Sequence, residues 1–284
     1  MPYMAYVISF SFIKKINEVY IYMTNKNLPI GVFDSGIGGL TVLEKLMEKF
    51  PKEDFIYVAD QGHCPYGTKS FDEIKECVLN VGKYLIANDV KAIVIACNTA
   101  SLFIKYLQEI TEIPVISVIE PTCMAAVNKT KVNKVAVLAT VATINKGAYQ
   151  ELLKQNNVEP FGVACSEFVD FVENYELDDP LGQEIVNKKL EVLKDSGVDT
   201  LIHGCTHFSL LEDNMRKVLG NINYVACGEP TSDRLYEILK EKSLLRESND
   251  SRYVKIGTTG SKENALMNMK WFKKEHEPIK EIRF

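Results

Sequence analysis

Short runs of apolar residues recur along the chain from residue 28 onward, and segments of mixed polarity separate them. Each run has the length and apolarity of a strand that is buried on both faces. In the intervening segments apolar residues return every three or four positions, as at Leu40, Leu43, Leu46, Met47 and Phe50, which predicts amphipathic helices. The nine strands that we expect span residues 30–34, 55–59, 91–96, 115–118, 134–139, 160–164, 200–203, 224–226 and 253–257.

This alternation of strands and helices predicts an α/β fold with mainly parallel sheets. Two stretches resemble each other, because residues 115–121 and 224–230 each contain a strand followed by Glu-Pro and a helix start. If both mark crossings between domains, residues 122–228 form one α/β domain, and residues 27–121 plus 229–284 form the other. We therefore expect two similar, closely packed α/β domains related by a pseudo-twofold axis, with the active site in the cleft between them.

The first 26 residues lie outside this alternation. The apolar run at residues 6–13 has no Lys or Arg before it and is followed by Lys14 and Lys15, which is the wrong order for a secretory signal. The run is also too short to span a bilayer. We interpret residues 1–26 as an extension outside the folded core, and Met23 as the candidate start of translation.

Composition narrows the class of protein. The 284 residues are 46% hydrophobic and 25% charged, and the net charge is −5 without any polybasic segment, which argues against nucleic acid as the main partner. Seven cysteines, an odd number without close Cys-x-x-Cys pairs, do not resemble a disulfide framework. We expect free thiols in a reducing cytoplasm and no association with a membrane.

Two of the cysteines have nearly duplicate settings. Cys97 and Cys205 each follow a predicted buried strand, precede a predicted helix, and are followed at once by polar residues. At such a turn the helix amides and dipole favour a thiolate. Because the two turns lie in what resemble repeated halves, they suggest a pair of acid/base groups that face one substrate. The simpler alternative is that both are small buried core residues.

A metal site is the alternative interpretation around the second cysteine. If strand geometry continued, His203, Cys205 and His207 would share a face and could offer three ligands. The helix expected from near Thr206 should turn His207 away from that line, and the sequence shows no fourth ligand. We therefore expect no metal, and interpret His207 as a group that steadies the Cys205 sulfur or exchanges its proton.

Two loops at strand ends are candidates for substrate contacts. The run Asp34-Ser35-Gly36-Ile37-Gly38-Gly39 opens the first helix and suits a carboxylate or phosphate, but it fits neither a dinucleotide fingerprint nor a P-loop. Asp34 could equally accept hydrogen bonds from turn amides. The loop at residues 62–70 could offer Tyr66 and the Gly67 amide to a substrate, or be a plain surface loop.

Together these residues resemble the glutamate racemases of the aspartate/glutamate racemase superfamily. The segments that carry the resemblance are Gly31–Gly39 in the one-letter form GVFDSGIGG, PYG at 65–67, ACNTA at 96–100 and GCTHF at 204–208, with a weaker match at 168–173. They occur in the order found in the family and cover about residues 29 to 260.

The resemblance implies a cofactor-independent racemase that interconverts L- and D-glutamate and supplies D-glutamate for peptidoglycan. Cys97 and Cys205 match the two catalytic cysteines, acting on D- and L-glutamate respectively, and Asp34, His207 and Glu173 match the groups that assist them. We expect Asp34 to support Cys97 across the cleft, and His207 with Glu173 to support Cys205. The substrate-binding positions implied are Asp34, Ser35, Tyr66, Gly67, Asn98, Thr99, Thr206 and His207. Glutamate is the expected partner, and a homodimer is a candidate assembly.

Two alternatives stay open at this point. One is a sister reaction, such as that of aspartate racemase, because side-chain packing decides which substrate length fits. The other is a non-catalytic role, such as the binding of DNA gyrase that some family members show. Departures from the family pattern at His203, Ser209, Glu167 and Asp170 leave the role of Glu173 open.

Overall fold

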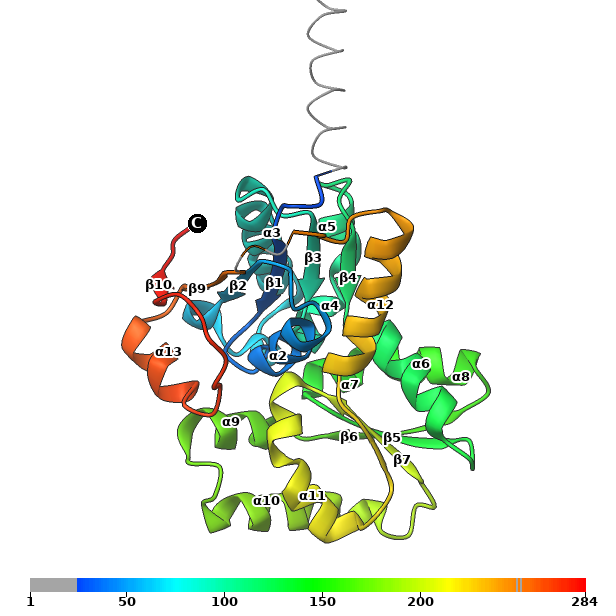
Figure 1. Ribbon diagram of the computed structural model, residues 1–284. Helices are drawn as coiled ribbons and strands as arrows, with labels where there is room; N and C mark the ends of the chain where they lie inside the picture. Colours follow the sequence, from blue (N-terminus) through cyan, green and yellow to red (C-terminus); the bar gives the residue numbers. More distant parts are fainter. Residues whose placement is uncertain (1–24, 249, 251) are drawn as a thin grey trace, which may run out of the picture.

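Two parallel sheets form the centre of the protein in a computed structural model that describes residues 25–248, 250 and 252–284. The first sheet has the strand order β10-β9-β2-β1-β3-β4 and the second the order β6-β5-β7-β8 (Figure 1). The strands are β1 (Ile30–Asp34), β2 (Phe55–Ala59), β3 (Ala92–Ile95), β4 (Val115–Ser117), β5 (Lys134–Ala139), β6 (Glu159–Ala164), β7 (Thr200–Gly204), β8 (Asn223–Val225), β9 (Val254–Thr258) and β10 (Lys280–Glu281). The predicted α/β class is confirmed.

The order β2-β1-β3-β4 in the first sheet repeats as β6-β5-β7-β8 in the second. Each sequence-predicted strand overlaps an observed one, and three of them, β1, β2 and β5, have the predicted bounds. The strand that the sequence did not predict is β10, which has two exposed polar residues at the edge of the first sheet and therefore no apolar signal.

Helices cover both faces of each sheet. They are α2 (Leu40–Lys49), α3 (Phe71–Ala87), α4 (Asn98–Ser101), α5 (Ile104–Gln108), α6 (Ile119–Lys129), α7 (Val141–Lys146), α8 (Ala148–Gln155), α9 (Ser166–Asn174), α10 (Pro180–Leu190), α11 (Glu212–Leu219), α12 (Gly228–Glu241) and α13 (Lys262–Asn268). Short 3₁₀ helices are η1 (Gln61–His63), η2 (Tyr66–Thr68), η3 (Glu191–Leu193) and η4 (Thr206–Leu211). None of the helices described is both long and apolar enough to span a bilayer.

Four apolar clusters result from this layering. In the first sheet, one face packs against α2, α12 and α13, and the other packs against α3 and α5. In the second sheet, one face packs against α9, α10 and α11, and the other packs against α6 and α8. Burial on both faces explains why the strands read as continuous apolar runs rather than as alternating patterns.

The chain passes between the two sheets twice. After β4 it enters α6, which packs on the second sheet, and after β8 it enters α12, which returns to pack on α2 (Figure 1). The boundary predicted at residues 121/122 therefore falls inside α6, and the one at 228/229 falls at the start of α12. The division into domains at those residues stays a prediction.

The predicted N-terminal extension, including Met23, lies outside the described residues except for Asn25 and Lys26. The backbone carbonyl of Lys26 accepts a hydrogen bond of 2.6 Å from Nζ of Lys91, a buried side chain that also pairs with Glu53. The described part of the predicted extension is thus tied to the first sheet.

Candidate active site

Cys97 and Cys205 follow equivalent strands of the two sheets. Cys97 comes after β3 and precedes α4, whereas Cys205 comes after β7 and precedes η4. Both side chains are buried, and both line one cavity of about 70 Å³ between the two halves. The repeated strand order therefore brings the two predicted cysteine turns to the same cavity.

Most of the predicted site residues line this cavity. They are Ser35, Tyr66, Gly67, Cys97, Asn98, Thr99, Cys205, Thr206 and His207. Asp34 and Glu173 are not among the lining residues, but each contacts one of them, Thr206 and His207 respectively. Other lining residues that were not predicted from the sequence include Cys64, Thr140, Ser166, Val169 and Asp170. Thr140 could have been found, because it directly follows β5 as Ser35 follows β1.

The surroundings of Cys97 keep it as a thiol. Burial, and then the negative charge of Asp34, raise the pKa of Cys97 to about 12. Two weaker contacts act in the opposite direction, because the backbone amide of Ala100 donates to Sγ at 3.5 Å and Sγ lies 3.5 Å from the hydroxyl oxygen of Ser35. Cys97 is the N-cap of α4, as the strand-turn-helix pattern predicts, but its helix is only four residues long.

Asp34 does not lie across the cleft from Cys97, which corrects the expectation from the sequence. It ends β1, the strand that pairs directly with β3, so Asp34 and Cys97 belong to the same sheet edge. Its carboxylate accepts a hydrogen bond of 3.0 Å from the backbone amide of Gly36, the turn contact that the sequence left open, and a longer one of 3.5 Å from Thr206. Burial raises the pKa of Asp34, and the charge on His207 opposes that rise.

The second cysteine begins a chain of polar contacts. Nδ1 of His207 lies 3.6 Å from Sγ of Cys205, and its Nε2 lies 2.6 Å from Oε1 of Glu173. The other oxygen of Glu173, Oε2, accepts a hydrogen bond of 3.0 Å from the amide of Asn268. These four residues come from the β7–η4 turn, η4 itself, α9 and α13.

The protonation of His207 follows from these contacts. Burial alone would lower the pKa of His207, but its contacts with Cys205 and Glu173 outweigh burial and raise the pKa well above its usual value. The pKa of Glu173 shifts in the complementary direction: burial would raise it, whereas His207 and Asn268 lower it. The pair is therefore an imidazolium and a carboxylate at neutral pH.

A glycine makes room for the imidazole. A Cβ atom on Gly38 would lie 2.5 Å from Nδ1 of His207 and 2.6 Å from Oγ1 of Thr206, closer than atoms can approach. The loop that carries Gly38 is fixed by Tyr57, whose hydroxyl donates to the carbonyl of Gly36 at 2.8 Å. The glycine-rich run noted in the sequence thus supports His207 as well as opening the first helix.

Two predicted substrate-binding residues connect the halves. The amide oxygen of Asn98 accepts a hydrogen bond of 2.7 Å from the hydroxyl of Tyr149, on α8. The hydroxyl of Thr99 lies 3.2 Å from that of Thr140 and 3.3 Å from that of Thr143, at the start of α7. Both side chains follow Cys97 and contact residues that pack on the second sheet.

Tyr66 is held by a buried carboxylate. Its hydroxyl donates to Oδ2 of Asp60 at 2.5 Å, while Oδ1 of Asp60 lies 2.8 Å from Nδ1 of His63 and accepts from Thr259 at 2.6 Å. Asp60, His63 and Cys77 also form a group of possible metal ligands within 4.8 Å of one another. Since hydrogen bonds already occupy both oxygens of Asp60, this group is best described as the support of the Tyr66 loop.

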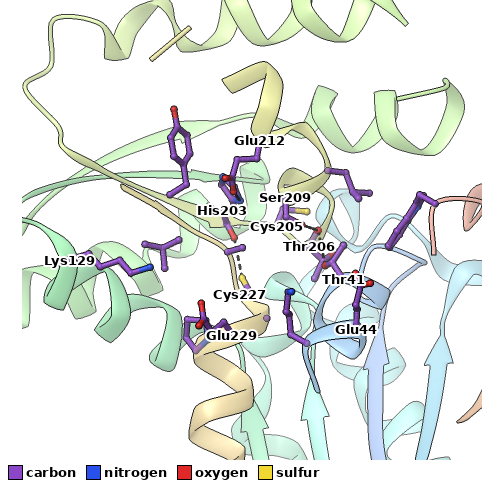
Figure 2. A pocket seen from close by; sticks show the side chains of 18 residues that line it. Thr41, Glu44, Lys129, His203, Cys205, Thr206, Ser209, Glu212, Cys227 and Glu229 are labelled. Atoms are coloured by element: carbon purple, nitrogen blue, oxygen red, sulfur yellow. Dashed lines mark hydrogen bonds and ion pairs between the residues drawn. The ribbon is translucent and has the colours of Figure 1, made fainter. Parts of the chain in front are cut away.

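The metal alternative at His203, Cys205 and His207 does not match the geometry. His203 lines a second cavity of about 350 Å³, together with Cys205, Cys227 and Glu212, whereas His207 lines the first cavity. In Figure 2 the His203 and Glu212 side chains lie together on one side of that second cavity, with Nδ1 of His203 3.9 Å from Oε2 of Glu212. Burial lowers the pKa of His203 to about 4, so its ring is neutral. The imidazoles of His203 and His207 thus line different cavities.

The chain is similar to known proteins over most of its length. The Asp/Glu/hydantoin racemase family matches residues 30–228. A glutamate racemase from Bacillus cereus is 36% identical over 264 residues, covering 90% of this chain and 97% of the relative. The crystal structure of a glutamate racemase from Bacillus anthracis superposes with a TM-score of 0.87 at 34% identity, over 91% of this chain and 98% of that chain. A glutamate racemase from Francisella tularensis, solved in complex with D-glutamate, gives 0.83 at 33% identity, with coverage of 91% and 98%.

Proposed function

The chain belongs to the Asp/Glu/hydantoin racemase family and, within it, to the glutamate racemases, which are amino-acid isomerases, and we propose a mechanism on that basis. In this proposal the protein interconverts L- and D-glutamate through two thiols, those of Cys97 and Cys205. The observation that carries the proposal is that both thiols follow equivalent strands and line one cavity. Inversion of an α-carbon needs a base on one side and an acid on the other, and a pair of opposed thiols supplies both.

In each direction one proton leaves the α-carbon and another returns on the opposite face. One cysteine takes the α-proton as a thiolate and becomes a thiol, while the other gives its proton as a thiol and becomes a thiolate. The charges on the two sulfurs are exchanged when the product leaves, so proton exchange with water restores the starting state.

The protonation of Cys97 supports a starting state that acts on L-glutamate. Cys97 is a thiol at neutral pH because burial and Asp34 raise its pKa to about 12, so it is the proton donor. Cys205 is then the base, and the imidazolium of His207, 3.6 Å from its sulfur, stabilises the thiolate. The assignment of Cys205 to L-glutamate agrees with the family resemblance.

The reverse direction requires a thiolate on Cys97. A negative charge on Asp34, at the end of the neighbouring strand, opposes that thiolate. Protonation of Asp34, whose own pKa is raised by burial, removes this repulsion. Asp34 is therefore proposed to act on Cys97 by changing its charge rather than by contacting the substrate.

The intermediate is a carbanion without a pyridoxal group to accept its electrons, since the resemblance implies a cofactor-independent reaction. Backbone amides and hydroxyls around the cavity, including those of Ser35, Asn98, Thr99 and Thr206, are proposed to bind the substrate carboxylates. The Tyr66 loop and α9 also line the cavity, and we propose that they limit the access of water to the carbanion. The product, D-glutamate, would supply peptidoglycan synthesis in the cytoplasm, with a homodimer as the candidate assembly.

Exchange of the α-proton in deuterated water tests the proposal. Wild type should place deuterium in the enantiomer that it produces. Cys97→Ser and Cys205→Ser should each lose racemisation, with residual exchange confined to L-glutamate in Cys97→Ser and to D-glutamate in Cys205→Ser. Cys123→Ala, a buried cysteine that packs between α6 and the second sheet, is the matched control and should keep activity. Undiminished racemisation by either serine variant would contradict the two-thiol mechanism.

A panel of L-amino acids, followed by circular dichroism, tests the choice of substrate. Loss of signal with glutamate but not with aspartate is expected. The opposite result would favour the sister reaction, and no loss with any amino acid would favour a non-catalytic role.

A further inference from the structure

Glu173 contacts residues from both halves of the protein. Its Oε1 lies 2.6 Å from Nε2 of His207, and its Oε2 accepts from Nδ2 of Asn268 at 3.0 Å. Glu173 lies on α9, which packs on the second sheet, and Asn268 is the last residue of α13, which packs on the first. Within the described residues these are the two hydrogen-bond partners of its carboxylate.

A second contact joins the same two helices. Nζ of Lys270, two residues beyond Asn268, lies 2.9 Å from Oε1 of Glu176, in the turn after α9. Both partners of this ion pair are largely exposed, whereas Glu173 is only 17% exposed. Both contacts thus join α9 or the turn after it to α13 or the residues after it, and we call this contact region the seam. Only the Asn268 contact includes a group that touches His207.

The position of α13 does not depend on Asn268. Ala265 and Met269 of this segment belong to the apolar cluster of the first sheet, which holds the helix in place. The Asn268 side chain, in contrast, reaches away from that cluster to α9. A glutamate side chain has three rotatable bonds, so fixing one carboxylate oxygen also fixes the direction of the other.

We propose that Asn268 is a positioning residue for the Cys205 side of the active site: by holding Oε2 of Glu173 it keeps Oε1 on His207, and so keeps His207 charged beside Cys205. The role depends on the two halves being in contact, because Asn268 and Glu173 belong to different halves. This inference rests on the proposed function for its link to catalysis, but not for its link to His207.

Titration of His207 by NMR tests the positioning directly and without any turnover. The chain has four histidines, so the imidazole signals can be assigned by substitution. The titratable groups that face His207 are Cys205 from its own turn, Glu173 from α9 and Asp34 from β1, with Cys64 beside Glu173. Asn268→Ala removes none of these groups, and His207 should be the one histidine of the four whose pKa falls. Lys270→Ala, the matched control on the same seam, should leave it unchanged.

The isosteric variant separates hydrogen bonding from packing. Asn268→Asp keeps the shape of the side chain but replaces the donor by a carboxylate that repels Glu173. If donation is what matters, Asn268→Asp should be less active than Asn268→Ala, whereas a packing role predicts the reverse order. If Asn268→Ala does not fold, the same experiments can be carried out with Asn268→Asp.

Isotope effects show which thiol is affected. L- and D-glutamate have equal free energies in water, so any variant changes kcat/KM equally for both. Slower transfer at Cys205 should nevertheless raise the deuterium effect on kcat/KM with α-deuterated L-glutamate and lower it with α-deuterated D-glutamate. We expect kcat/KM of Asn268→Ala to fall by roughly tenfold, as for other small misplacements of a catalytic group.

The outcomes are distinct. An unchanged His207 titration in Asn268→Ala, or an equal change in Lys270→Ala, overturns the positioning role. A lowered pKa of His207 in a protein whose wild type does not racemise glutamate would support the positioning role while the proposed function fails. A lowered pKa together with opposite shifts of the two isotope effects supports both.

Discussion

Nε2 of His207 lies 2.6 Å from Oε1 of Glu173, although 34 positions separate the two residues in the chain. The other ring nitrogen, Nδ1, lies 3.6 Å from Sγ of Cys205, so the protonated ring faces the carboxylate through one nitrogen and the sulfur through the other. Both contacts favour the charged form of the ring, and this is the basis of the first two predictions.

Replacing Glu173 with Gln should reduce kcat/KM by roughly 100-fold, at the lower end of the range for loss of an acid/base group, because Glu173 acts through His207. The amide cannot stabilise the imidazolium by charge, so His207 loses its proton more easily and the Cys205 thiolate is less well supported. Steady-state rates from both enantiomers check this. Glu176→Gln, which alters the exposed partner of Lys270, should retain wild-type rates. Full activity in Glu173→Gln would remove Glu173 from the mechanism.

Stability should depend on pH through His207. Its pKa in the folded protein is raised above the unfolded value, so its charged interactions stabilise fully below about pH 6.5 and are lost as pH rises through the raised pKa. The difference in free energy of unfolding between wild type and His207→Gln should therefore shrink as pH rises above about 6.5 and through the raised pKa of His207. Urea unfolding at a series of pH values measures it. A difference that grows with pH would show that the ring is neutral in the folded protein.

Gly38→Ala should displace His207 without unfolding the protein. The added Cβ would lie 2.5 Å from Nδ1 of the ring, so the imidazole must move away from Cys205. A shift of about 1 Å at a catalytic group can cost on the order of 100-fold in rate. Rates and the melting temperature should be measured together. As a control, Gly162→Ala, whose Cβ would lie 3.0 Å from Nε2 of Gln150 and away from the candidate site, should leave the rate unchanged.

Asp60→Ala should loosen the Tyr66 loop and destabilise the fold. Removing the carboxylate leaves the Tyr66 hydroxyl and Thr259 without their acceptor, at a cost of roughly 2–4 kcal/mol in the free energy of unfolding. KM should rise for both enantiomers, because the loop encloses the cavity. Denaturant unfolding and substrate titration check the two effects. His63→Ala removes only the exposed partner of Asp60, and should have little effect on either. A wild-type KM in Asp60→Ala would show that the Tyr66 loop does not contribute to substrate binding.

Local patterns were sufficient for the strands and the cysteine turns. A strand buried on both faces needs a continuous apolar run, and β1, β2 and β5 have the bounds that their runs predict. The two turns were recognisable because polar residues follow Cys97 and Cys205 at the strand ends, where a parallel sheet collects its ligands.

Relationships between distant residues were not available from the sequence. The position of Asp34 beside Cys97, rather than opposite it, depends on β1 pairing with β3, and no local pattern specifies strand order. The separation of His203 and His207 into different cavities depends on the conformation of one turn after β7. The contact of Asn268 could not be predicted, because an asparagine at the end of a helix is common in any sequence. Its role depends on Glu173, which lies on another helix, α9.

The repeated strand order β2-β1-β3-β4 and β6-β5-β7-β8 has a stereochemical consequence. A twofold rotation about an axis in the plane of a trigonal carbon exchanges the two faces of that carbon. A fold that duplicates its thiol-bearing turn about such an axis therefore presents like groups to mirror-related sides of a flat intermediate. In the proposed mechanism the two thiols therefore act on opposite faces of one carbon, and their unlike neighbours, Asp34 and His207, distinguish the two directions of reaction.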